Sequence, residues 1–229
     1  MAVTALRRHS NTDRIDTLKD LVKRLGGVPL SRILFDPPPG TATEEDVIRY
    51  VDGDDKRLVE LVDGVLVEKT MGWFEGCVAA MIIHIVREYL DKHDLGMITG
   101  ADGTLRLMPG LVRIPDVAFI SWNRFPDQEL PVEPLPDLAP DLAIEVLSKG
   151  NTKREMERKT REYFEAGAKL VWLVDIKKKV VDVYTSPKEF TRLSETEPLD
   201  GGKVLPGFKT TLREILQRAS GGRKFRSKK

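Results

Sequence analysis

The spacing of apolar residues predicts several amphipathic helices along the chain. A period of 3.6 residues, with apolar side chains three and four positions apart, is typical of a helix that covers a core. Five segments show this period: 11–25, 43–51, 73–93, about 152–166, and a last segment from about 211. The longest of them lies between Trp73 and His93 and predicts the main helix of the fold.

Runs rich in Val, Ile and Leu predict strands between these helices. They cover residues 58–62, 65–67, 96–108, 112–121, 141–148, 169–175 and 179–184, and a short strand or turn is expected around 204–208. Asp63-Gly64 separates the first two runs and is a strong signal for a hairpin. Pro109-Gly110 marks a further turn. The order of elements predicts a mixed α/β fold, in which a mixed sheet is flanked by helices on both sides.

The chain divides into three parts by composition. Residues 36–40, Asp-Pro-Pro-Pro-Gly, can neither continue a helix nor lie in a central strand. We therefore expect an N-terminal arm and linker over 1–40 and a main domain over 41–217. Residues 218–229 are rich in Gly, Lys and Arg, which predicts a basic, disordered tail.

Composition indicates the class of the protein and the compartment in which it works. The 229 residues are 41% hydrophobic and 32% charged, with a net charge of +1, as in ordinary globular proteins. We find no apolar run of membrane-spanning length and no apolar leader segment at the N-terminus. The one cysteine, Cys77, fits a reducing compartment. We expect a cytoplasmic protein that does not interact with a membrane.

Several enzyme classes lack their motifs in this sequence. There is no glycine-rich phosphate loop of the GxxxxGK type, and the single cysteine and three histidines do not show zinc-site spacing. No histidine lies beside a serine nucleophile motif. The three tryptophans are scattered along the sequence, so they do not predict a platform for stacked bases.

Two carboxylates lie inside runs that otherwise predict core strands. Asp116 follows Pro115 in the run at 112–121, and Glu145 lies within the run at 141–148. A carboxylate among apolar side chains is costly unless a cation lies beside it. Oxygen ligands of this kind suit Mg²⁺, which predicts a divalent-metal site, with a salt bridge to a basic helix residue as the alternative. Glu60 is a third candidate, weighed equally against an outward-facing strand residue.

The helix after Glu145 brings a cation toward the sheet. At 100° per residue, Lys159 falls beside Tyr163 on the apolar side, opposite Arg158 and Arg161. Its ammonium group should therefore meet one of the two strand acids. The excess of basic residues over 149–161 fits either attraction to phosphate or a solvated basic face.

The order of these features resembles a known family. Pro115-Asp116, the run Glu145-Val146-Leu147-Ser148, and the spacing of Glu155, Lys159, Tyr163 and Gly167 are similar to those of the Uma-type restriction endonucleases, a branch of the PD-(D/E)XK nuclease superfamily. The hairpin at Glu60 and the strand at 172–175 resemble that family as well. The resemblance runs from about residue 41 to 216.

The resemblance implies a restriction-endonuclease-like core and an enzyme. It implies hydrolysis of phosphodiester bonds in nucleic acid, with DNA as the expected substrate, by a homodimer that uses Mg²⁺, with Mn²⁺ as a substitute. Asp116 matches the acid of the PD pair, Glu145 matches the acid of the (D/E)XK element, and Glu60 matches a recurrent acid of the early hairpin. With the backbone carbonyl of Val146, these three are the implied metal ligands.

The lysine of the superfamily pattern is displaced in this chain. Leu147 occupies its usual place in the strand, and Lys159 on the following helix matches the displaced position. Asp116, Glu145, Lys159 and Glu60 are thus the implied catalytic residues. Two alternatives stay open. One is a catalytically inactive nuclease fold that binds nucleic acid or protein, and the other is a purely structural pairing of Glu145 with Lys159.

Overall fold

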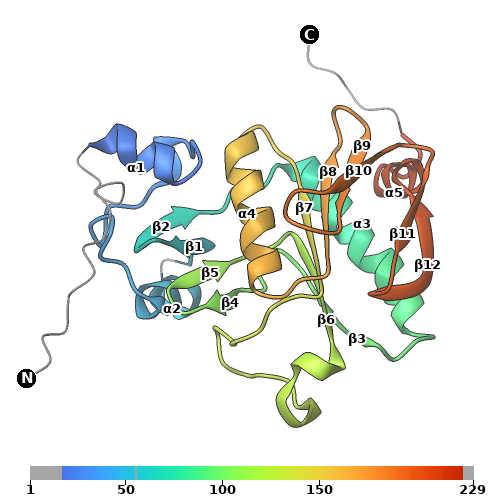
Figure 1. Ribbon diagram of the computed structural model, residues 1–229, viewed down its shortest axis with the longest axis horizontal. Helices are drawn as coiled ribbons and strands as arrows, with labels where there is room; N and C mark the ends of the chain where they lie inside the picture. Colours follow the sequence, from blue (N-terminus) through green and yellow to red (C-terminus); the bar gives the residue numbers. More distant parts are fainter. Residues whose placement is uncertain (1–16, 55, 224–229) are drawn as a thin grey trace, which may run out of the picture.

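A six-stranded mixed sheet forms the main layer of the fold (Figure 1). The computed structural model describes residues 17–54 and 56–223. The order of the strands across the sheet is β10 (Phe190–Ser194), β9 (Val180–Tyr184), β8 (Leu170–Asp175), β7 (Leu142–Val146), β6 (Val117–Ser121) and β3 (Gly96–Thr99). β7 and β8 run parallel, whereas the other neighbours in this sheet are antiparallel. The prediction of a mixed sheet is confirmed.

Helix α4 (Lys153–Glu165) connects the two parallel strands. Thr152 and Glu155 form a capping box at its start, which satisfies backbone donors of the first turn. Gly167, with a φ of 95°, follows the helix and lets the chain turn back into β8. These bounds agree closely with the predicted helix over 152–166.

Helices cover both faces of the sheet. On one face, α3 (Trp73–Leu90) and α5 (Leu212–Ala219) pack against β6, β7 and β8 around Trp172, which is fully buried. On the other face, α4 and α1 (Leu18–Arg24) pack over the alternate residues of the same strands, including Ala143 and Val171. Burial on both faces explains why these central strands consist of near-continuous apolar runs.

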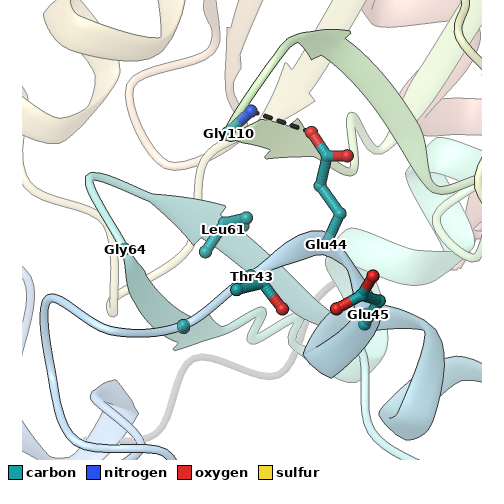
Figure 2. A pocket seen from close by; sticks show the side chains of 7 residues that line it. Thr43, Glu44, Glu45, Leu61, Gly64 and Gly110 are labelled. Carbon is teal, nitrogen blue, oxygen red and sulfur yellow. Dashed lines mark hydrogen bonds between the residues drawn. The ribbon is translucent and has the colours of Figure 1, made fainter.

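A second, four-stranded sheet lies beside the first. Its order is β2 (Val65–Glu68), β1 (Val59–Val62), β5 (Leu111–Arg113) and β4 (Leu105–Met108). Asp63 and Gly64 join β1 to β2 with φ values of 52° and 71°, as a two-residue hairpin turn requires. Glu44 of α2 (Glu44–Asp52) accepts a hydrogen bond of 2.8 Å from the Gly110 N–H, which ties this helix to the β4–β5 turn (Figure 2).

The segment before α2 packs onto the domain. Leu21, Leu25 and Val28 are buried in the core on the α4 side, and the short 3₁₀ helix η1 (Leu30–Arg32) follows them. Residues 1–16 of the predicted arm lie outside the described residues. The predicted tail begins inside α5, and its residues 224–229 also lie outside them. The division at residues 40 and 217 stays a prediction.

Two predicted strands are each divided in the structure. The run at 96–108 becomes β3 and β4, and the run at 112–121 becomes β5 and β6, so each run spans both sheets. Pro115 has no N–H to donate to a ladder, and the chain passes between sheets at this residue. The break leaves Asp116 immediately before β6.

Part of the C-terminal region differs from the predicted strands. β10 and β11 (Pro198–Gly201) were not expected from the sequence, and the predicted segment at 204–208 covers only part of β12 (Leu205–Thr211), which pairs with β11. Two 3₁₀ helices, η2 (Trp122–Arg124) and η3 (Pro126–Gln128), follow β6. Over the described ranges, no helix is both long and apolar enough to cross a bilayer.

Candidate active site

Asp116 lies immediately before β6, and Glu145 lies on the neighbouring antiparallel strand β7. The register that pairs Val117 with Ile144 places Asp116 opposite Glu145. Asp116 Oδ2 accepts a hydrogen bond of 2.6 Å from the backbone N–H of Val146, the residue after Glu145. Both acids are buried. The structure therefore brings the two predicted strand acids together at the point where β6 begins and β7 ends.

Lys159 reaches this point from α4, which lies where the two sheets approach each other (Figure 1). Its Nζ lies 3.1 Å from Glu145 Oε1 and 2.7 Å from Glu60 Oε1, and the residue is 2% exposed. Tyr163, one turn further along, donates a hydrogen bond of 2.6 Å to the same Glu145 oxygen. Burial lowers the pKa of Lys159, but Glu145 and Glu60 outweigh it and hold this pKa above its usual value, so the ammonium stays charged.

Glu60 is the most completely enclosed acid of the cluster. Besides Lys159, its Oε1 accepts a hydrogen bond of 3.1 Å from the Ile114 N–H, and its Oε2 lies 2.7 Å from Arg113. Burial raises the pKa of the Glu60 carboxyl, yet Lys159 and Arg113 together hold it well below its usual range. Arg113 continues the network to Glu162 of α4, with Nε 2.8 Å from Oε2.

Lys69 is a site residue that the sequence analysis missed. It follows β2, and its Nζ lies 2.7 Å from Asp116 Oδ1 and also donates to the carbonyl of Ile114. The same analysis missed Arg113. The desolvation argument predicts that each buried carboxylate has a cationic partner, but it cannot select that partner among the 37 Lys and Arg residues of the chain.

The donor atoms available here fit a divalent cation that also takes ligands from water or substrate. Among the residues that the structure describes, no three His, Cys, Asp or Glu side chains are arranged to hold a metal by themselves. Glu145 Oε2 receives no hydrogen bond from any residue in the described ranges, whereas both oxygens of Glu60 are engaged, and Asp116 contacts Lys69 through Oδ1 and the Val146 N–H through Oδ2. The carboxylates of Asp116 and Glu145 and the Val146 carbonyl match the coordination typical of Mg²⁺, which keeps several waters and binds one or two carboxylates.

Comparison with known proteins identifies the family. A profile of the Uma2 family, described as "Putative restriction endonuclease", matches residues 45–213. The chain belongs to the Uma2 family. This confirms the resemblance seen in the sequence, and the matched range contains every residue of the cluster described above.

A solved structure shows the same fold. It is described as a "putative nuclease belonging to DUF820" from Anabaena variabilis ATCC 29413 and superposes with a TM-score of 0.64 at 15% identity. The match covers 72% of this chain and 92% of the other. No curated protein matches the sequence. The Uma2 assignment and this fold together confirm the predicted restriction-endonuclease-like architecture.

Proposed function

We propose that this Uma2 protein is a metal-dependent endonuclease that hydrolyses phosphodiester bonds of DNA. The proposed cofactor is Mg²⁺, with Mn²⁺ as a substitute, and the proposed setting is a cytoplasmic homodimer. One observation carries the proposal: Asp116 just before β6, Glu145 on β7 and Lys159 on α4 meet at one point. A fold that needed only a core at this point would be served as well by apolar side chains, without the desolvation of several charges.

The proposed reaction is an in-line displacement at phosphorus. A water oxygen forms the new bond while the opposite P–O ester bond breaks, and the leaving oxygen takes up a proton. A cation held by Asp116, Glu145 and the Val146 carbonyl would supply a Lewis acid that polarises the phosphate and acidifies the attacking water.

The lysines of the site have electrostatic roles in this proposal. Lys159 holds an ammonium group against Glu145, where it orients the water or stabilises negative charge that develops on the phosphate. Lys69 provides a second ammonium group on the Asp116 side. Glu60, whose two oxygens are engaged by Lys159 and Arg113, acts as a positioning residue for Lys159, although its assignment as a metal ligand stays a prediction.

Cleavage assays of matched variants test this proposal. Single-stranded DNA, duplex DNA and RNA are incubated with wild type, Asp116→Asn, Glu145→Gln and Lys159→Met, with Mg²⁺ or with a chelator. We expect cleavage by the wild type that the chelator abolishes and that each variant lowers by at least about 100-fold, as the loss of about 2.7 kcal/mol of transition-state stabilisation would give. Glu165→Gln, at an exposed position on the same helix, is the matched control.

Metal binding gives a separate readout. Mg²⁺ and Mn²⁺ should raise the melting temperature of the wild type, because a ligand that binds only the folded state stabilises it. Asp116→Asn and Glu145→Gln should reduce that rise, and Glu165→Gln should not. If the wild type cuts no substrate with metal and is not stabilised by it, the enzymatic proposal is wrong and the inactive, binding form of the fold is favoured.

A further inference from the structure

A groove runs along α4 on the side of the β9–β10 hairpin. It has a volume of about 660 Å³ and lies between the first turns of α4 and the β9–β10 hairpin, which are adjacent in Figure 1. Leu147 and Ser148, which directly follow β7, form one end of it. The groove thus begins within three residues of Glu145 and leads away from the proposed site.

An aromatic pair lines the hairpin side of this groove. Tyr184 of β9 and Phe190 of β10 are cross-strand partners, with ring centroids 4.8 Å apart and planes inclined by 27°. The guanidinium of Arg192 lies 5.8 Å from the centroid of the Phe190 ring. Phe190 is 46% exposed, so part of its ring faces solvent. The pair offers unpaired bases a surface of the kind on which they stack.

The charged groups around the groove are arranged with the cations outward. Arg192 holds Asp182 by two hydrogen bonds of 2.7 and 2.8 Å, and the arginine side chain is 56% exposed against 16% for the aspartate. Lys178 lies 3.0 Å from Asp175, and its side chain is 73% exposed against 17% for the aspartate. Lys153, at the first position of α4, is 90% exposed. The lining also includes Glu157, which is 55% exposed and lies 3.6 Å from Lys153. With Lys177, the four cations outnumber the three acids, and the cations of the Arg192 and Lys178 pairs are the partners that face solvent, as a phosphate backbone requires.

We infer that this groove binds an unpaired stretch of the DNA strand next to the phosphate that is cleaved. Bases pack against Phe190 and Tyr184, and phosphates lie along Arg192, Lys178 and Lys153. This inference rests on the proposed nuclease function for its choice of ligand, and it adds a substrate-binding surface outside the carboxylate cluster. Paired bases hide their faces within the duplex, so the aromatic pair favours single strands.

Binding of a fluorescent oligodeoxythymidylate of about 12 nucleotides tests the inference by anisotropy, in EDTA so that no strand is cut. Phe190→Ala should weaken binding by about 5- to 150-fold, the loss of one stacked base. Phe35→Ala is the matched control, because Phe35 is 56% exposed, does not line the groove and has the same side chain. Phe190→Trp should retain binding. A duplex of the same length should bind wild type and Phe190→Ala equally.

The outcomes separate this inference from the nuclease proposal. If Phe190→Ala binds the single strand as tightly as the wild type, or no more weakly than Phe35→Ala does, the groove assignment is overturned even when Glu145→Gln abolishes cleavage. If no preparation cuts DNA but Phe190→Ala still weakens binding selectively, the groove assignment holds and the catalytic proposal fails. An equal loss of binding affinity for single strand and duplex would also overturn the groove assignment, since stacking on an open base face could not explain that result.

Discussion

Lys159→Met should reveal how strongly the fold depends on one buried ammonium group. Lys159 is 2% exposed, and its Nζ lies 2.7 Å from Glu60 and 3.1 Å from Glu145. Methionine fills a similar volume without charge, so the change leaves two buried carboxylates that share no cation at this point. Breaking a buried pair in this way costs about 3–5 kcal/mol, most of it from the uncompensated charge that remains.

The assay is urea unfolding at pH 7, followed by tryptophan fluorescence. Trp172 is fully buried in the core between the sheet and α5, so its emission reports loss of the central packing. A loss of about 3–5 kcal/mol in the free energy of unfolding of a domain of this size would also lower its melting temperature by about 6–20 °C. The surface control is Lys153→Met, whose side chain is 90% exposed and 3.6 Å from Glu157, and which should cost at most about 1 kcal/mol.

A double-mutant cycle measures the interaction between Glu145 and Lys159 by itself. Glu145→Gln should destabilise the protein less when Lys159 is already Met than when Lys159 is present, because the second change then removes a carboxylate that has lost its partner. If Lys159→Met is no more destabilising than Lys153→Met, the reasoning from buried charge is refuted. Activity of each variant is compared only below the temperature at which it unfolds.

Two further predictions concern other parts of the structure. Burial raises the pKa of the Asp141 carboxyl, but hydrogen bonds from Lys169 and Ser121 outweigh it and hold this pKa below its usual value. The stabilisation that the ionised Asp141 gives is therefore present above the unfolded pKa of about 3.9 and is lost as pH falls through the folded value. Asp141→Asn should therefore cost about 1.5–3 kcal/mol at pH 7, and its urea midpoint should approach that of the wild type below pH 4. Gly64→Ala should destabilise more than Gly110→Ala, because both glycines have a φ above 70° but only a Cβ at Gly64 would meet backbone, 2.8 Å from Gly40. Equal urea midpoints for the two glycine variants would contradict the steric argument.

Local signals in the sequence predict most of the elements that hold the site. The Asp63-Gly64 turn, the long helix at α3 and the β7–α4–β8 unit each depend on residues close in sequence, and all appear in the structure. The angular position of Lys159 also follows from helical geometry alone, which is why its approach to Glu145 could be anticipated.

The sequence does not reveal contacts between elements that are distant along the chain. Lys69 reaches Asp116 across the two sheets, and nothing near either residue in sequence marks the other as its partner. The hairpin strand β10 escaped prediction for a different reason. Its residues are mostly exposed, so their polarity does not alternate as in a half-buried strand, and the stacking of Phe190 on Tyr184 becomes visible only once the strands are paired.

In the proposed mechanism, Lys159 links the chemistry of the site to the packing of α4. A lysine at position 147 would directly follow the strand that carries Glu145, whereas Lys159 on α4 contacts an acid of each sheet, Glu60 on β1 and Glu145 on β7. The position of its ammonium group is then set by how the helix lies across both sheets. Because the same group compensates two buried carboxylates, loss of cleavage in a Lys159 variant alone cannot distinguish a chemical role from a structural one. The comparison of the double-mutant cycle with cleavage by the folded variants can separate the two.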